Sequence, residues 1–172
     1  MASIPFKIAP KDTPLPSGGS AYCKVLSPRK ALSKVYLPLF ACKVAAGFPS
    51  PAADYIDKTL DLNELLVAKP AATYFVRVQG DSMINAGIHP NDILVVDRSI
   101  DPIPGKIVIC ALNNEITVKR LAYENEHWKL KAENEEYPDF PLNDDLELVV
   151  WGVVTSVIHL LWARKIQWRQ SV

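Results

Sequence analysis

The chain has 172 residues, of which 49% are hydrophobic and 22% charged, and its formal net charge at pH 7 is zero. This length suits one domain with a core plus an appendage and argues against two full domains. The zero total hides an asymmetry, because residues 1–46 carry a net charge of +6. That segment contains one acid, Asp12, and seven bases: Lys7, Lys11, Lys24, Arg29, Lys30, Lys34 and Lys43. A basic segment ahead of an acidic remainder indicates either self-docking or contact with an anionic partner.

The cysteines and the apolar stretches of the sequence indicate in which cellular compartment the protein is expected. Cys23, Cys42 and Cys110 are an odd number without CxxC spacing, which argues against a disulfide framework or a zinc site and favours a reducing cytosol. The apolar run "LVVWGVVTSVIHLLW" from Leu148 is shorter than the ~20 residues of a membrane span, so it predicts a core strand or strand pair. The stretch "VYLPLFACKVAA" lies too far from the N-terminus for a signal sequence and contains Lys43. We therefore expect a cytoplasmic protein without membrane contact, cofactor or metal.

The first elements are weakly patterned. Residues 1–46 hold six of the 14 prolines and the stretch "SGGS", so they predict a flexible, extended arm with at most a short helical piece near residues 29–35. Ser50 and Pro51 read as a helix start. The sequence "DLNE" at 61–64 gives a second start signal, with Asp61 as the N-cap of a short helix that ends before Pro70.

From Thr73 the pattern becomes that of strands separated by turns. "HPND" at 89–92 and "DPIPG" at 101–105 predict turns, and "NNE" at 113–115 predicts a tight hairpin. These features predict a mainly β fold of short, mostly antiparallel strands with one or two short helices. The predicted strands are Thr73–Gln79, Ile93–Asp97, Lys106–Leu112, Glu115–Leu121, Trp128–Ala132 and Leu146–Leu160.

Ser82, in the fragment "QGDSMI" at 79–84, is the candidate nucleophile. A serine hydroxyl needs a base to take its proton. The three histidines, His89 in a turn, His127 in a polar loop and His159 near a strand end, are each expected to be ordinary surface or core residues. Gly80 allows a sharp turn that aims main-chain N–H groups at an oxyanion, and Asp81 is expected to stabilise that turn.

Lys119 can replace histidine as the base if it is neutral. At an ordinary pKa of about 10.4, roughly one lysine in a thousand is neutral near pH 7.4, a handicap of about 4 kcal/mol. Burial lowers a lysine pKa by up to about 3–5 units, which removes that handicap. In "EITVKRL" strand alternation puts Thr117, Lys119 and Leu121 on one face, opposite Arg120. A lysine on a strand is common, and a serine in a turn is equally so.

The combination of motifs resembles the UmuD-type members of the LexA-like self-cleaving serine peptidases. The resemblance rests on "GDSM", on the separation of 37 positions between Ser82 and Lys119, and on "AG" followed by "FPSPAADY". It runs from about Ala46 to about His159, roughly two-thirds of the chain. It implies the LexA-like peptidase fold, with Ser82 as nucleophile, Lys119 as general base and the Ala46–Gly47 bond as the one cleaved.

The resemblance also implies a biological role. Cleavage would be stimulated by RecA filaments on single-stranded DNA, as part of the SOS response to DNA damage. It would remove residues 1–46 and leave residues 47–172 as the peptidase and dimerisation domain. The resulting homodimer would serve a UmuC-type error-prone polymerase in translesion synthesis. The segment ahead of the bond is longer than expected for UmuD-type proteins, and the tail "WARKIQWRQSV" from Trp162 extends past the resemblance.

Other functions remain as alternatives. A LexA-like transcriptional repressor controlled by the same cleavage needs a helix-turn-helix domain ahead of the bond. Forty-six residues with six prolines do not predict one, so we expect no sequence-specific DNA binding. An interaction protein that has lost cleavage would be expected to lack the serine or the lysine. A membrane signal peptidase with a similar dyad would need a spanning helix.

Overall fold

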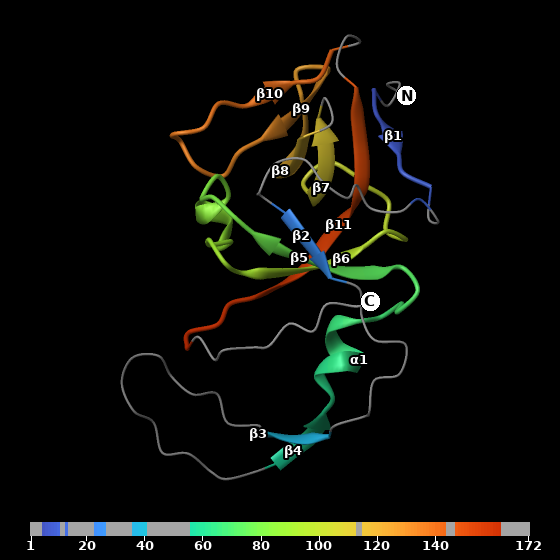
Figure 1. Cartoon of the computed structure of the whole chain (residues 1–172), viewed down its shortest axis with the longest axis vertical. Helices are drawn as coiled ribbons and strands as arrows, with labels where there is room; N and C mark the ends of the chain where they lie inside the picture. Colours follow the sequence, from blue (N-terminus) through green and yellow to red (C-terminus); the bar gives the residue numbers. More distant parts are fainter. Residues whose placement is uncertain are drawn as a thin grey trace.

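A computed structural model gives the arrangement of the chain (Figure 1). The residues that it describes are 5–10, 13, 23–26, 36–40, 56–112, 115–143 and 147–162. Four features considered above lie outside these residues: the helical piece at 29–35, the helix start at Ser50 and Pro51, the Ala46–Gly47 bond and the tail beyond Trp162.

The described residues form one large sheet and one small one. The large sheet has the order β10-β9-β8-β7-β11-β6-β5-β2, with β1 beside β11. Except for the parallel pair β1 and β11, every pairing is antiparallel, which confirms the mainly antiparallel β fold. Its strands are β1 (Lys7–Ile8), β2 (Cys23–Leu26), β5 (Thr73–Val78), β6 (Ile93–Asp97), β7 (Ile107–Leu112), β8 (Glu115–Glu124), β9 (His127–Lys131), β10 (Phe140–Pro141) and β11 (Leu148–Ile158).

The predicted strands from Thr73 onward all occur, with ends shifted by a few residues. β6 matches its prediction at both ends, and the apolar run from Leu148 forms one strand. β8 continues three residues beyond the predicted Leu121. Leu112 pairs with Glu115, so β7 and β8 are the strands of the predicted hairpin.

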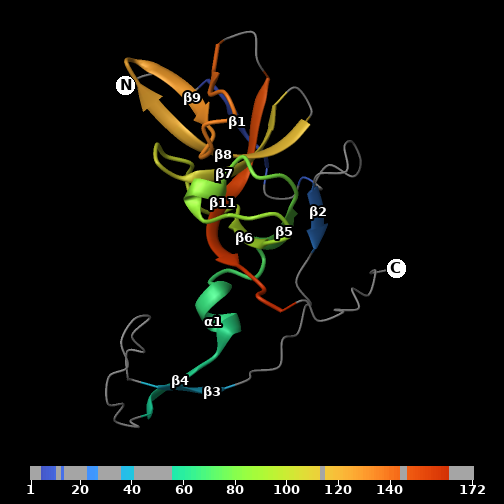
Figure 2. The ribbon, with the colours of Figure 1, turned by 90° about the vertical axis from the view of Figure 1, so that its left-hand side faces the viewer.

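β11 joins the two halves of the sheet. It pairs with β7 through Leu148–Val153 and with β6 through Val153–Ile158, and its register shifts at two points. A side chain at Gly152 would place its Cβ 2.8 Å from Val96 Cγ1, so only glycine fits where β11 crosses β6. Figure 2 shows the long, curved course of β11 through the molecule.

Apolar strand residues form the core in two clusters. One centres on β5 and β6 and includes Val76, Leu94 and Val96, none of which is exposed. The other includes Val108 and Leu121, which are equally buried. β6 is buried along its whole length, as expected of a continuous apolar run in the middle of a sheet.

The described residues of the N-terminal arm include three short strands that the sequence does not predict. β1 pairs with β11 through Lys7–Val149 and Ile8–Val150 (Figure 1). Phe6 packs edge-on against Trp128, with ring centroids 5.6 Å apart. β2 pairs with β5 along Phe75–Val78.

The third arm strand belongs to the small sheet. β3 (Leu37–Phe40) pairs there with β4 (Ile56–Leu60), and both views place this sheet beyond α1 (Leu62–Leu66), away from β9 and β10 (Figures 1 and 2). The predicted cap of α1 is confirmed, because Asp61 accepts a hydrogen bond of 2.8 Å from the main-chain N–H of Asn63. No helix among the described residues is long and apolar enough to cross a membrane.

Candidate active site

Ser82 lies in the loop that follows β5. Gly80 bends this loop with a φ of +81°, in the left-handed region that side chains disfavour. A Cβ at Gly80 would meet no atom within 4 Å, so the glycine serves the backbone conformation and not a close contact. The next residue after Ser82, Met83, is buried and anchors the loop in the core, while Ser82 itself stays partly exposed.

A second loop, between β9 and β10, holds the serine loop in place. The N–H of Glu133 donates to Ser82 O at 2.9 Å, and the N–H of Asn85 donates to Glu133 O at 2.8 Å. Asn134 Nδ2 donates to Asp81 O at 3.2 Å. The main chain on both sides of Ser82 is therefore fixed, which keeps the position of its side chain well defined.

Lys119 reaches Ser82 from β8. It pairs with Val108 of β7, and only 5% of Lys119 is exposed. Its Nζ lies 2.8 Å from Ser82 Oγ, which is hydrogen-bonding distance. The predicted alternation holds here, since Leu121 is also buried whereas Arg120 forms an ion pair with Glu133.

Burial is the main electrostatic influence on Lys119. It lowers the pKa of the amine, because a buried ammonium loses its hydration. A charged Cys110 thiolate would oppose this, but Cys110 is itself buried and its pKa is raised to about 12. The thiol is therefore neutral at physiological pH, so it does not offset the lowering of the Lys119 pKa by burial.

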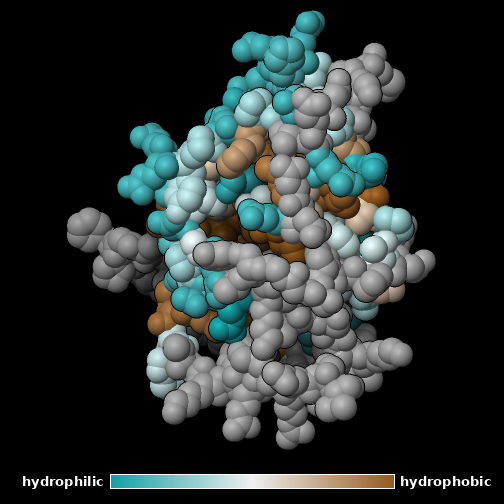
Figure 3. Space-filling view, turned by 45° about the horizontal axis from the view of Figure 1, so that its top comes forward, coloured by the Kyte–Doolittle hydropathy of each residue, from teal (hydrophilic) through white to brown (hydrophobic). Residues whose placement is uncertain are grey.

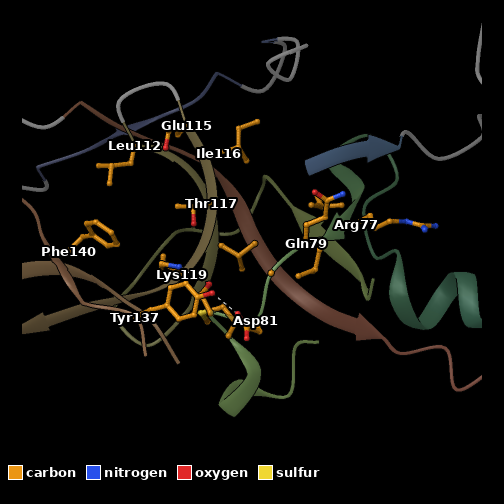
Figure 4. A pocket seen from close by; sticks show the side chains of 16 residues that line it. Arg77, Gln79, Asp81, Leu112, Glu115, Ile116, Thr117, Lys119, Tyr137 and Phe140 are labelled. Carbon is orange, nitrogen blue, oxygen red and sulfur yellow. Dashed lines mark hydrogen bonds between the residues drawn. The ribbon is translucent and has the colours of Figure 1, made fainter. Parts of the chain in front are cut away.

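Ser82 and Lys119 both line a cleft of about 380 Å³. Figure 4 shows Lys119, Tyr137 and Asp81 close together, with Phe140 and Leu112 to one side of them and Gln79 and Arg77 to the other. Figure 3 shows hydrophilic residues at the upper end of one face and hydrophobic ones toward its middle. The cleft is lined by Val76–Val78, Gln79–Met83, Leu112, Glu115–Lys119, Tyr137 and Phe140.

Tyr137 is the site residue that the sequence does not predict. Its hydroxyl donates to Asp81 Oδ1 at 2.6 Å, and Lys119 Nζ lies 5.9 Å from the centre of its ring. The hydrogen bond to Asp81 raises the pKa of Tyr137, which keeps the phenol protonated as a donor. The Asp81 side chain is predicted to stabilise its own turn, whereas the hydrogen bond that it accepts comes from Tyr137, 56 positions away, where no local pattern points to it.

Two of the three histidines lie close together, and the third lies apart from them. His127 is exposed on β9. His89 and His159 lie together with Asp92, and none of the three lines the cleft. Within the described part of the chain, these three residues are the one group of three or more His, Cys, Asp or Glu side chains whose possible ligand atoms all lie within 4.8 Å of one another.

The predicted cleavage bond, Ala46–Gly47, lies outside the described residues. Along the chain it falls between β3, which ends at Phe40, and β4, which begins at Ile56. Those two strands pair with each other and not with the large sheet.

The chain matches one protein-family profile and is similar in sequence to several known proteins. The profile of the family described as Peptidase S24-like matches residues 38–155. The chain is 46% identical over 122 residues to protein SamA of Salmonella typhimurium, which covers 71% of this chain and 84% of SamA. It is 44% identical over 120 residues to protein MucA of Escherichia coli, covering 69% and 82%. It is 33% identical over 156 residues to the LexA repressor of Cupriavidus necator, covering 91% and 68%.

Proposed function

The chain belongs to the Peptidase S24-like family, and on that basis we propose that it is a serine peptidase of the UmuD type that cleaves itself with a Ser82–Lys119 dyad. The observation that carries the proposal is the distance of 2.8 Å between Lys119 Nζ and Ser82 Oγ. Burial lowers the pKa of this lysine. Neutral lysine has a lone pair, so it can take the serine proton.

The reaction follows from this geometry. Lys119 accepts the Ser82 proton as Oγ attacks the carbonyl carbon of Ala46, and main-chain N–H groups of the loop at Gly80 stabilise the oxyanion. The C–N bond to Gly47 then breaks, and the Lys119 ammonium gives its proton to the departing amine. Water hydrolyses the resulting ester, with Lys119 acting again as base, and restores free Ser82.

The bound segment has a strand edge to join. β9 pairs with Arg120–Glu124 of β8, and no strand among the described residues pairs with the same edge of Glu115–Lys119. That edge lines the cleft and leads to Lys119. The segment around the bond would lie there as an added strand, the way extended peptides bind to open sheet edges. Small residues at Ala46 and Gly47 let its backbone approach Ser82 closely.

Control of the reaction would lie in the placement of this segment. A tethered substrate needs no affinity of its own, because intramolecular attack has a large effective molarity. The flanking strands β3 and β4 pair with each other in the small sheet, so cleavage requires the segment between them to enter the cleft. A RecA filament on single-stranded DNA would favour that conformation, since a partner shifts an equilibrium toward the state that it binds better.

The product, residues 47–172, would form a homodimer and serve a UmuC-type polymerase in translesion synthesis during the SOS response. The resemblance to UmuD-type proteins supports this role. A repressor controlled by cleavage is the alternative, and the chain's similarity to a LexA repressor favours it. A repressor of that kind binds DNA through a helix-turn-helix domain, whereas the described residues ahead of the bond contribute strands β1, β2 and β3.

Incubation of the whole chain with RecA filaments, followed by intact-mass measurement, tests the proposal. We expect two products, one of which begins at Gly47. Ser82→Ala and Lys119→Ala should each leave a folded, uncut chain. Cleavage that persists in either variant would refute the dyad, and a product beginning elsewhere would refute the bond. Specific, sub-micromolar binding of the uncut chain to an operator would favour the repressor.

A further inference from the structure

A compact group of two histidines and an aspartate lies at the end of the β6–β11 ladder. Asp92 directly precedes β6 and His159 directly follows β11. Ile93 pairs with Ile158, so this register brings the two residues opposite each other. His89 enters from the turn before β6, where its N–H donates to Asp92 Oδ2 at 2.7 Å.

The Asp92 carboxylate lies between the two imidazoles. Its Oδ1 is 2.6 Å from His159 Nδ1, and its Oδ2 is 3.8 Å from His89 Nδ1. The centres of the two rings are 5.2 Å apart. One ligand atom from each of the three residues lies within 4.8 Å of the others. Bonds from a zinc ion to imidazole nitrogen and carboxylate oxygen are about 2.0–2.2 Å long, so the three atoms would move closer together when they bind one ion.

The two histidine side chains are partly exposed, so a metal ion bound here could also bind water as its fourth ligand. The Asp92 side chain is 2% exposed, whereas the side chains of His89 and His159 are 45% and 49% exposed. The carboxylate is thus buried beneath two rings that reach solvent. A site of three protein ligands with water in the fourth position has this layout.

A second observation points to a ligand. His89 Nδ1 is buried and has no hydrogen-bond partner among the described residues. A buried nitrogen without a hydrogen bond costs free energy, and a metal ion removes that cost by accepting its lone pair. Two imidazoles and one carboxylate are ligands typical of zinc and of neighbouring divalent transition metals.

We propose that His89, Asp92 and His159 form a binding site for a divalent transition-metal ion, zinc being the best match to these ligands. The ion ties the end of β11 to the turn before β6. The turn before β6 is also bonded to the end of β5, because the N–H of Val78 donates to Asp92 O and the N–H of Asn91 donates to Val78 O. Ser82 follows Val78 by four residues, so the ion stabilises the base of the serine loop without contacting the dyad.

Zinc titration of the purified, metal-free chain tests the site. Calorimetry should show one high-affinity zinc ion per chain, and the melting temperature should rise when zinc is added. His89→Ala and His159→Ala should each weaken zinc binding by more than about 10–100-fold, the range for losing only a group that orients a metal ligand. Both rings are partly exposed, so the metal-free variants should keep the far-UV circular dichroism of the parent.

His127→Ala is the matched control, because it removes the remaining histidine of the chain without touching the group. Its zinc affinity should equal that of the parent. Thiols also bind zinc, so the comparison among histidine variants decides the site. The proposal is overturned if the parent binds no zinc, if His89→Ala and His159→Ala bind it as tightly as the parent, or if His127→Ala weakens binding equally. Because these measurements do not involve cleavage, they stand apart from the test of the peptidase.

Discussion

A lysine in water holds its proton at neutral pH, whereas Lys119 is 5% exposed and has the Ser82 hydroxyl 2.8 Å from its nitrogen. Burial costs the ammonium its hydration, and the neutral Cys110 thiol beside it offers no compensating charge. At the scale of single residues, the proposed chemistry therefore depends on solvation. The same strand places Lys119 in the core and Arg120 in an ion pair with Glu133.

The rate of self-cleavage should rise with pH, because only the neutral form of Lys119 accepts the serine proton. The lowered pKa of Lys119 sets the midpoint of this rise, and the rate should level off at higher pH. Quantification of cut and uncut chain on gels over time, at a series of pH values, measures the profile. A rate that stays constant between mild acid and about pH 10, an upper limit near the ordinary lysine pKa, would count against Lys119 as base.

The burial of Lys119 should also make the free energy of unfolding depend on pH. Above about pH 10.4 lysine is neutral in both folded and unfolded chains. As pH falls from there toward the lowered pKa of Lys119, the unfolded chain takes up a proton that the folded chain does not. Stability should therefore fall by about 1.4 kcal/mol per pH unit in this window relative to Lys119→Met, which binds no proton.

Urea unfolding across this pH range measures the effect. Ser82→Ala serves as the background for both chains, so that neither is cut during the measurement. The two unfolding free energies should diverge as pH is lowered through the window and run parallel below it. A difference between the chains that does not change with pH would mean that Lys119 keeps an ordinary pKa.

Among the elements, the arm strand β1 packs on the body of the protein. β1 adds to the free edge of β11, and the segment around it buries Phe6 against Trp128 and Ala9 in the core. Ala9 also donates its N–H to Val150 O at 2.9 Å. In the uncut chain, part of the segment ahead of the proposed bond is thus packed on the body.

Phe6→Ala should destabilise the uncut chain by about 1–2 kcal/mol, because it removes a partly buried ring and its aromatic contact. Ile8→Ala is the matched control on the same strand, since Ile8 is 51% exposed and should matter by less than about 0.5 kcal/mol. Urea midpoints of the two variants in the Ser82→Ala background give the comparison. Equal midpoints would mean that the segment does not pack on the body in solution.

At the scale of the whole molecule, the sequence predicts most of the body and less of the arm. The strands from Thr73 onward carry strong alternation or continuous apolar runs, and these place β5 to β9 and β11 within a few residues. The arm strands are two to four residues long and take their pairing from β11, β5 and β4, so no local pattern marks them. Such pairing is a tertiary property.

The site divides in the same way. The motifs predict Ser82 and Lys119 as a pair, and the structure places Lys119 Nζ 2.8 Å from Ser82 Oγ. The turn that Gly80 allows is predicted as well. Tyr137 and the His89–Asp92–His159 group depend on which distant segments the sheet brings together. The pairing of β6 with β11 would have indicated that group, because it sets Asp92 opposite His159.

The proposed dyad depends on the amine of Lys119, which gives up its proton more readily than an ordinary lysine because burial lowers its pKa. Nuclear magnetic resonance of the Ser82→Ala chain, with the lysine side chains isotopically labelled and Lys119 assigned through Lys119→Met, measures its pKa directly. We expect one lysine, absent from the spectrum of the double variant, to titrate well below about 10.4 while the other lysines titrate near that value. A Lys119 that titrates with the others, at or above that value, would contradict the account.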